Sequence, residues 1–294
     1  MGRMHFVNVK GILSGKNIMN LYRGCSHGCI YCDSRSKCYH IEHTFEDIEV
    51  KKNAIELLEN ILKHKRKKCM IATGYMSDPY IPIEKELGNV RKALSVIYKY
   101  GFGATVLTKS SNILRDIDLI GKINEKTKCV VQMTLTTYNE SLCKKIEPNV
   151  SSTNERFQVL MKLRDKGIPT VVWLSPILPF INDTEDNISG ILDLCIEAKV
   201  YGVICFGMGL TLREGSREYF YKQLDRKFTD LKDKYIQTYG NEYIMTSPNN
   251  NKLMKLFEEK CKSNGIVCNN SEIFNYLQQF EEKNKVKQLS MWDL

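Results

Sequence analysis

The sequence predicts an α/β fold, a partial (β/α)6 TIM-like barrel with a helical C-terminal extension. Short apolar stretches rich in β-branched residues recur along the first two thirds of the chain, as buried parallel strands do. Amphipathic stretches with helical spacing separate them. From about residue 210 only the helical pattern continues. We therefore expect a barrel domain over residues 1–210 and a helical region with a flexible tail over 211–294.

Six strands are expected, and helices connect them. The strands are near residues 17–23 and at 69–74, 104–108, 129–135, 170–174 and 202–207. The helices are at 52–65, 87–100, 112–125, 152–166 and 185–198. Ser152 and Thr184 suit helix N-caps, and Gly167 suits the position after a helix. Six units favour an incomplete barrel over a closed one. A doubly wound sheet is the alternative, but this chain lacks the GxGxxG turn that such a sheet would have after its first strand.

The C-terminal region is expected to contain three helices. Apolar residues from Phe220 to Tyr235 mark the first, which ends near Gly240. The others span about 250–263 and 271–281. This region either covers the barrel or presents a docking surface.

The composition is that of an ordinary globular protein with an excess of basic residues. Lysine plus arginine number 43 against 34 acidic residues, a net charge of +9. This charge favours polyanionic partners, although a basic protein without a nucleic-acid partner stays possible. The chain has no apolar run of membrane-spanning length and no signal-peptide pattern, so we expect a cytoplasmic protein.

The eleven cysteines are therefore not expected to form a disulfide framework. Four of them stand singly in apolar runs and are expected to be small core residues: Cys69, Cys129, Cys195 and Cys205.

The stretch "YRGCSHGCIYCDSRSKCY", residues 22–39, concentrates thiols. Cys25, Cys29 and Cys32 are spaced C-x3-C-x2-C. Three thiolates can bind three irons of a 4Fe-4S cluster and leave the fourth iron open to a substrate or cofactor. Gly24 and Gly28 allow a tight loop.

Positive charge is expected beside this electron-rich site, from Arg23, His27 and Arg35. The alternative is a zinc site with Cys38, His27 or His40 as the fourth ligand. In a parallel sheet the loops after the strands share one edge. The cysteine loop should therefore meet "TGYMSDP", "LTKSS", "TLTT" and "SPILPF" around one mouth.

The segment "CSHGCIYC" resembles the signature of the radical S-adenosylmethionine enzymes, C-x3-C-x-aromatic-C. The resemblance implies that Cys25, Cys29 and Cys32 ligate a 4Fe-4S cluster whose open iron binds S-adenosylmethionine. One electron would cleave that cofactor to a 5′-deoxyadenosyl radical, which abstracts hydrogen from a substrate. Tyr31 would lie beside the adenine.

A narrower resemblance covers most of residues 18–210. The stretches "YRGCSHGCIYC", "SDP", "LTKS", "MTLTT" and "IEPNVSS" are similar to the spore photoproduct lyase group, also called DNA repair photolyase-like. The resemblance implies that Ser77 and Asp78 lie near the cofactor. It also implies that Lys109 pairs with the methionyl carboxylate and that Thr134 hydrogen-bonds to the cofactor. Alternatively, Asp78 only forms a turn and Thr134 is only a strand residue.

The sequence departs from that group at the hydrogen donor. Where the lyase has a cysteine two residues before its Ser-Asp pair, this chain has Tyr75. Tyr75 is therefore a candidate catalytic residue, or simply an aromatic residue lining the mouth. Cys38, just past the cysteine loop, is a second candidate.

The last residues, "QLSMWDL", resemble the short peptide by which bacterial repair proteins bind the sliding clamp. Leu289, Met291 and Trp292 would fill apolar pockets, and Gln288 would fix the polarity. Alternatively, Met291 and Trp292 pack back onto the helical region.

The sequence as a whole predicts a radical S-adenosylmethionine enzyme that acts on nucleic acid, with DNA as the expected partner, in lesion repair or base modification. It would need an electron donor such as flavodoxin or ferredoxin and no membrane. The alternatives are RNA or peptide modification, or a zinc-stabilised nucleic-acid-binding module without catalysis.

Overall fold

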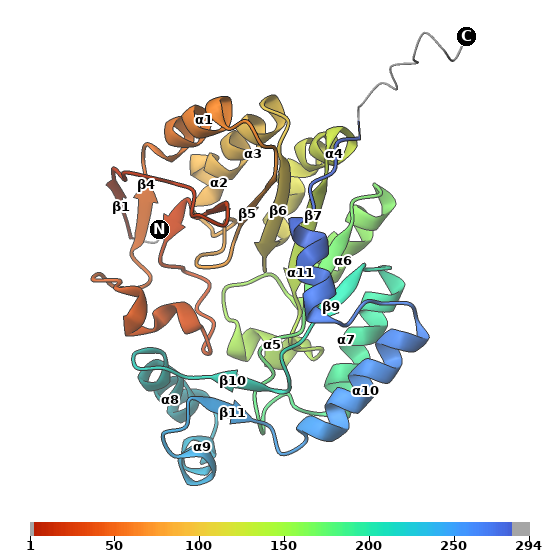
Figure 1. Cartoon of the computed structure of the whole chain (residues 1–294). Coiled ribbons are helices and arrows are strands. Elements are labelled where there is room, and N and C mark those ends of the chain that lie inside the picture. The colour runs from red at the N-terminus through yellow and green to blue at the C-terminus, as the bar shows by residue number, and fades with distance from the viewer. Residues whose placement is uncertain (1–2, 284–294) are drawn as a thin grey trace.

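The computed structural model describes residues 3–283, and its centre is a six-stranded parallel sheet (Figure 1). The strands follow one another in chain order: β2 (Ile18–Met19), β5 (Met70–Thr73), β6 (Gly103–Thr108), β7 (Cys129–Thr134), β8 (Thr170–Trp173) and β9 (Gly202–Ile204). Each pairs in parallel with the next. Sequential order with helical crossovers is that of a partial barrel, which confirms the predicted fold class.

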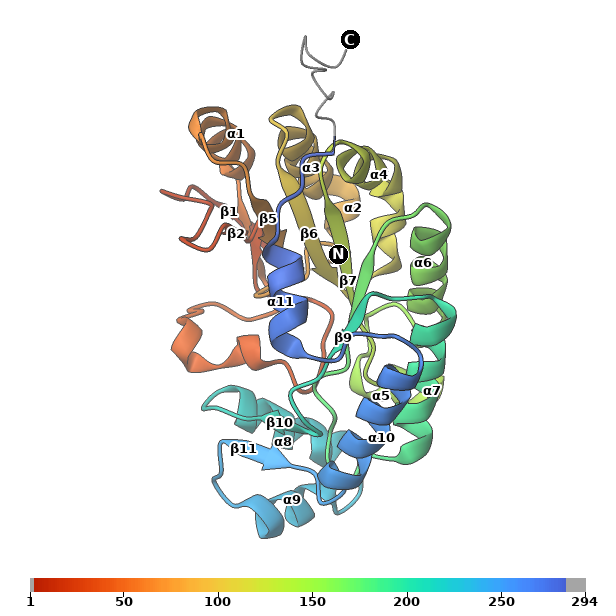
Figure 2. The same ribbon diagram turned by 45° about the vertical axis from the view of Figure 1, so that its right-hand side comes forward.

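Helices cover the outer face of this sheet (Figures 1 and 2). They are α1 (Ala54–His64), α2 (Glu84–Leu87), α3 (Asn89–Lys99), α4 (Ile117–Lys126), α5 (Glu140–Ile146), α6 (Thr153–Asp165) and α7 (Glu185–Glu197), with a 3-10 turn, η3 (Ser111–Asp116), before α4. Ser152 and Thr184 cap α6 and α7 as predicted, since each hydroxyl accepts from an N–H of the first turn. Gly167 follows α6 with a φ of 63°.

The predicted first strand is in fact two strands in two sheets. Ile18–Met19 belongs to the main sheet, whereas β3 (Tyr22–Arg23) pairs antiparallel with β4 (Ile48–Lys51). On the other side of β4 lies β1 (Met4–Val7), parallel to it. The chain leaves the barrel between β2 and β3, and the resulting small sheet carries the cysteine loop. That loop contains two short 3-10 turns, η1 (Asp33–Arg35) and η2 (Lys37–Tyr39).

The prediction of helices only after residue 210 is wrong. Two short strands, β10 (Gly209–Thr211) and β11 (Ile244–Thr246), pair antiparallel and form the edge of the region beside the cysteine loop. The single helix predicted over Phe220 to Tyr235 is two, α8 (Ser216–Lys227) and α9 (Leu231–Tyr239). Asp230 breaks it, with a φ of 57°. The apolar spacing continues across the break because Phe228 and Leu231 pack on the same apolar cluster as the buried residues of the two helices.

The last two helices cover the barrel. They are α10 (Asn250–Ser263), which packs on α7, and α11 (Asn270–Gln278), which packs on β9. Ile273 and Leu277 of α11 form a buried cluster with Val130, Val171 and Ile204 from three strands. Because side chains alternate along a strand, these three face away from the outer helices, so α11 fills the inner side of the partial barrel. The domain boundary at residue 210 stays a prediction.

The core cysteines are mostly where the sequence predicts them. Cys129 and Cys195 are fully buried, and Cys205 is nearly so, while Cys69 is only partly buried. Within residues 3–283, no helix is both long enough and apolar enough to cross a bilayer. The tail residues Gln288, Leu289, Met291 and Trp292 lie outside the described residues.

Candidate active site

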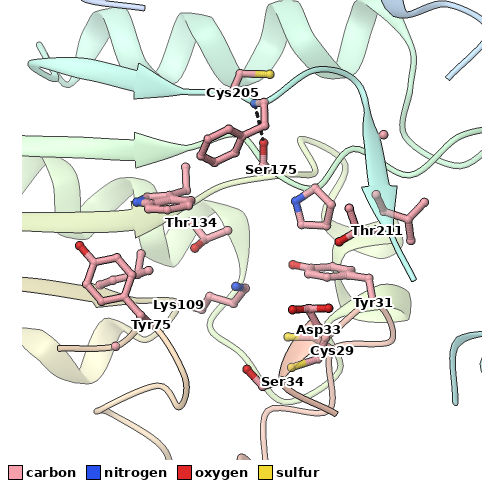
Figure 3. Close-up of a pocket in the computed structure, with 18 of the residues that line it drawn as sticks. Cys29, Tyr31, Asp33, Ser34, Tyr75, Lys109, Thr134, Ser175, Cys205 and Thr211 are labelled. Carbon is pink, nitrogen blue, oxygen red and sulfur yellow. Dashed lines mark hydrogen bonds between the residues drawn. The ribbon is translucent and has the colours of Figure 1, made fainter. Parts of the chain in front are cut away.

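A cavity of about 920 Å³ opens at the carboxyl ends of the strands (Figure 3). The cysteine loop lines one side, and residues at or just after the ends of β5, β6, β7, β8 and β9 line much of the rest, as the parallel arrangement predicts. Thr246, Asn250, Met254 and Asn270 of the C-terminal region complete the wall. Its size lies at the upper end for small-molecule sites, so the cavity has room for a cofactor and part of a substrate.

The cysteine loop presents three thiols to the cavity, those of Cys25, Cys29 and Cys32. Gly24 turns the loop with a φ of 84°, and a Cβ there would lie 2.5 Å from the Phe45 carbonyl oxygen. That carbonyl accepts a hydrogen bond from the Cys25 N–H at 2.9 Å. Burial, with smaller effects from Cys32 and Asp78, raises the pKa of Cys25 to about 12. A metal centre would therefore have to displace the thiol protons, as metal–thiolate sites do.

The cation at this site is Lys109, which comes directly after β6. Its burial disfavours the charge, but the neighbouring Cys29 and Glu147 outweigh that effect and the pKa of Lys109 is raised. Its Nζ lies 5.8 Å from the centre of the Tyr31 ring and has no hydrogen-bond partner among the described residues. Figure 3 shows it between Tyr31 and Tyr75. A partly buried ammonium without a hydrogen-bond partner in the described part of the chain is suited to hold an anionic group of a ligand.

Of Arg23, His27 and Arg35, which were expected to put positive charge beside the cysteines, only His27 lines the cavity. Arg23 donates to the carbonyls of Tyr39 and His40, and the Arg35 guanidinium lies 3.7 Å from the centre of the Tyr219 ring. His27 does line the cavity, but burial lowers its pKa, which favours the neutral ring. Both its ring nitrogens are buried without a hydrogen bond.

Asp78 and Ser77 shape the site through protein contacts. The Asp78 carboxylate accepts from the Lys109 N–H at 2.7 Å and from the Thr108 hydroxyl at 2.7 Å. It also accepts from the Tyr80 N–H at 2.8 Å, which is the turn expected as the alternative. The Ser77 hydroxyl donates to the Gly24 carbonyl at 2.6 Å. Both residues thus connect strand ends to the segments that line the cavity.

A buried ion pair that the sequence did not reveal lies behind the cysteine loop. Arg156 Nη2 is 2.6 Å from Glu147 Oε2, and both side chains are fully buried. The Tyr31 hydroxyl donates to Glu147, and Arg156 also donates to the Thr134 carbonyl at 2.8 Å. Although burial works against it, Arg156 and Lys109 keep the pKa of Glu147 low. The pair therefore fixes Tyr31 and Thr134, which both line the cavity.

Glu147 stands in the quoted "IEPNVSS" stretch, and Arg156 lies on the helix after it. Neither residue has a spacing that would reveal their pairing. The only sign in the sequence that Arg156 has a buried partner is that a charged residue stands on the buried face of a helix, where charged residues are rare unless paired.

The opposite side of the cavity is aromatic. We call Tyr75, Trp173 and Phe206 the aromatic wall; the first two rings are 6.2 Å apart and edge-on, and the last two 5.9 Å apart. Gln132 donates to the Tyr75 hydroxyl at 2.8 Å and accepts from the Trp173 indole at 2.7 Å, so both rings are held in place. Phe206 is 63% exposed. An exposed ring beside two fixed rings can receive a planar group.

The two candidate hydrogen donors lie differently. Tyr75 lines the cavity, whereas Cys38 is exposed and is not among the lining residues. Cys38 Sγ instead accepts from Arg213 at 3.6 Å. The sequence missed a further thiol, because Cys205 was expected only in the core. It also lines the cavity, and burial raises its pKa to about 11.

Comparison with known proteins identifies the class. The model of the Radical SAM superfamily matches residues 19–195, which is more than half of the chain. The chain therefore belongs to the Radical SAM superfamily, and its cofactors are a 4Fe-4S cluster and S-adenosylmethionine. This assignment favours the enzyme over the zinc-binding module.

Two curated relatives show how far the likeness extends. An uncharacterised protein of Methanocaldococcus jannaschii is 34% identical over 181 residues, which are 61% of this chain and 67% of the relative. A protein of Pseudomonas phage M6, named Radical SAM Nalpha-GlyT isomerase, is 27% identical over 165 residues, which are 55% of this chain and 33% of the relative. The chain thus matches only a third of the phage protein.

Solved structures share the fold. A spore photoproduct lyase with bound AdoMet and dinucleoside spore photoproduct has a TM-score of 0.60 at 15% identity, over 83% of this chain and 72% of that one. A radical SAM methyltransferase from Sphaerobacter thermophilus has a TM-score of 0.50 at 13% identity, over 85% and 64% of the two chains. At these identities the likeness establishes the fold alone.

Proposed function

We propose that Cys25, Cys29 and Cys32 hold the 4Fe-4S cluster and that the cofactor lies between them and Lys109. The thiols of Cys25, Cys29 and Cys32 lie on one tight loop and line the same cavity as the Lys109 ammonium, which supports this assignment. When bound, the cluster and S-adenosylmethionine supply a carbon-centred radical that takes hydrogen from a substrate.

The chain's own residues bind and orient the cofactor. Lys109 would pair with its carboxylate, and Tyr31, held by Glu147, would present a fixed ring to the adenine. Thr134 also lines the cavity and offers a hydroxyl to the cofactor. Ser77 and Asp78 would act as positioning residues, because their polar atoms already bond to the protein.

We further propose that the substrate is nucleic acid, most simply a DNA base taken out of the stack. The observation that carries this proposal is the aromatic wall across the cavity from the cysteine loop, since enzymes that act on a base commonly stack it between apolar and aromatic side chains. The net charge of +9 and the fold shared with a lyase bound to a dinucleoside photoproduct agree with it. The reaction class would be DNA lesion repair or base modification.

The hydrogen donor, if the reaction returns a hydrogen atom to product, would be Tyr75 or Cys205. Both line the cavity, and their raised pKa values keep the O–H and S–H protonated near neutral pH. Cys38, at the surface, is the less suitable candidate.

The experiment is anaerobic turnover with deuterated substrates. The reconstituted protein is given S-adenosylmethionine, a reductant and either deuterated single-stranded DNA, RNA or peptide, and 5′-deoxyadenosine is analysed by mass spectrometry. The proposal predicts deuterium from DNA. Label from RNA or peptide instead would support the second candidate, modification of those substrates. Absence of cofactor cleavage under every condition would contradict the whole proposal.

The partners beyond the substrate stay predictions. An electron donor such as flavodoxin or ferredoxin would reduce the cluster, and a cytoplasmic location would suit both donors. The sliding clamp would bind the tail. Clamp retention of the full chain that is lost on Leu289→Ala and Trp292→Ala would support this, and unchanged retention would refute it.

A further inference from the structure

Three potential metal ligands gather on the small sheet, outside the cavity. His5 is on β1 and Glu49 on β4, and the two residues are directly opposite in the parallel register. His43 comes from the loop between η2 and β4. One ligand atom from each of the three lies within 4.8 Å of the other two. None of them lines the cavity described above.

The histidine rings are oriented as in metal sites. His43 Nδ1 lies 3.0 Å from the Thr44 carbonyl oxygen, which can only accept, so this nitrogen carries the proton. The other nitrogen, Nε2, then has a free lone pair. It is buried and has no hydrogen-bond partner. His5 Nδ1 lies 3.3 Å from a carboxylate oxygen of Asp47. Carbonyl and carboxylate partners of this kind orient the imidazole ligands of metals.

An ordinary ion pair accounts less well for this cluster. His43 Nε2 is 3.8 Å from Glu49 Oε2, which is too long for a hydrogen bond. The two imidazole rings lie edge-on with centres 4.9 Å apart, so two protonated rings would repel each other. Arg23, the partner of Glu49 on β3, donates instead to the carbonyls of Tyr39 and His40. Glu49 is thus available to a cation.

We propose that His5, His43 and Glu49 bind a divalent transition metal, for which zinc is the best match, with water as the fourth ligand. Two imidazoles and one carboxylate are a common zinc set, with bonds of about 2.0–2.2 Å. Ligands on such a tetrahedron stand roughly 3.4 Å apart. Small side-chain rotations are therefore enough to close the observed spacing.

The position of this site gives it a structural role. It would tie β1 to the segment 43–49, which supports the cysteine loop. Phe45 in that segment accepts from the Cys25 N–H and lies against Gly24. A metal here would hold that segment in place whether or not the cluster is bound.

The test uses the full chain without a histidine tag, in a background with Cys25→Ala, Cys29→Ala and Cys32→Ala, so that the loop thiols cannot bind the metal. After treatment with a chelator, cobalt(II) is titrated in as a spectroscopic probe and then displaced by zinc. We expect one cobalt per chain, with visible absorption of a low-coordinate site and no intense thiolate band. The background also separates this proposal from the proposed function, which could fail independently.

Variants assign the site. Loss of a residue that hydrogen-bonds to a metal ligand typically lowers metal affinity by about 10–100-fold. Asp47→Asn should therefore weaken cobalt binding by about 10-fold, and loss of a ligand in His43→Ala or Glu49→Gln by more than about 100-fold. His64→Ala, at an exposed histidine of α1, is the matched control. Circular dichroism verifies that each variant is folded. If His43→Ala does not fold, Glu49→Gln alone still tests the site. Equal binding by the background and the folded variants, or no binding at micromolar cobalt, would overturn the proposal.

Discussion

The two sides of the cavity are built on different physical principles. The side of the cysteine loop holds thiols and the Lys109 ammonium, and a buried Glu147–Arg156 ion pair behind it hydrogen-bonds to Tyr31 and Thr134. On the other side, the aromatic wall has few polar groups and ends in the exposed ring of Phe206. The first side suits one small, charged ligand in one orientation. The second suits planar groups such as bases, because stacking uses their faces and does not depend on the hydrogen-bonding groups at their edges.

The proposed function therefore assigns the loop side to the cofactor and the aromatic side to the substrate. Charged groups in a buried site need exact partners, because an unpaired charge is costly, so such a site selects one ligand. Aromatic faces accept any base. Substitutions on the two sides should therefore affect different measurements.

The largest effect is expected from Cys29→Ala on the loop side. With two of the three thiols left, formation of 5′-deoxyadenosine should fall to background, because the cluster loses a ligand. Product is measured by chromatography after anaerobic reconstitution. Cys69→Ala is the control, since that thiol lies outside the cavity, and it should keep full activity. Equal activity of the two variants would refute the assignment of the loop.

Arg156→Met tests the ion pair behind the loop. It leaves Glu147 buried without its nearest cation, so the free energy of unfolding should fall by about 3–5 kcal/mol. Urea denaturation of the cluster-free protein measures it. Lys252→Met removes an exposed pair with Glu185 and should cost at most about 1 kcal/mol. A loss equally small for Arg156→Met would mean that the pair contributes little to this side.

Lys109→Met should weaken binding of the cofactor rather than binding of the substrate. Loss of a charge-assisted hydrogen bond worth about 1.5–3 kcal/mol should raise the KM for S-adenosylmethionine roughly 10–150-fold. Cofactor cleavage without substrate gives this KM. Lys99→Met, at an exposed lysine paired with Glu59, should leave it unchanged. An unchanged KM in Lys109→Met would remove the ammonium from the cofactor's binding site.

Phe206→Ala should weaken binding of the substrate rather than binding of the cofactor. Loss of one stacked base, about 1–3 kcal/mol, should weaken binding of single-stranded DNA roughly 5–150-fold and leave substrate-free cofactor cleavage as it is. Fluorescence anisotropy measures the binding. Phe6→Ala removes a similarly exposed ring on β1, outside the cavity, and serves as the control. Similar weakening in both variants would show that binding does not use the aromatic wall.

The smallest effect is expected from Ser77→Ala. It removes the hydrogen bond to the Gly24 carbonyl and should lower the free energy of unfolding by about 1 kcal/mol. Ser95→Ala, at an exposed hydroxyl of α3, should change it by less than about 0.5 kcal/mol. Thermal denaturation of the two variants side by side resolves this difference. No difference would mean that Ser77 does not support the loop.

Much of the barrel could be predicted from the sequence because its signals are local. Buried parallel strands such as β8 are short runs of mostly apolar, β-branched residues, and the Ser152 cap is visible in four residues. The small sheet and the break at Asp230 could not be predicted, since β3 has only two residues and the apolar spacing continues through the break.

The candidate site divides in the same way. Residues next to a strand end, such as Lys109 and Tyr75, were predicted because chain position alone places them at the mouth. The partners of Tyr31 were not, since the Glu147–Arg156 pair joins segments through space. Cys205 was missed because an apolar strand gives no sign of which of its last residues faces a cavity.

The most direct test of the division of the cavity is photochemical cross-linking. Single-stranded DNA with one 5-iododeoxyuridine is bound to the cofactor-loaded protein, irradiated and digested, and the cross-linked peptides are identified by mass spectrometry. We expect cross-links to Tyr75, Trp173 or Phe206, at reduced yield in Phe206→Ala. Cross-links only to residues remote from the cavity would contradict it.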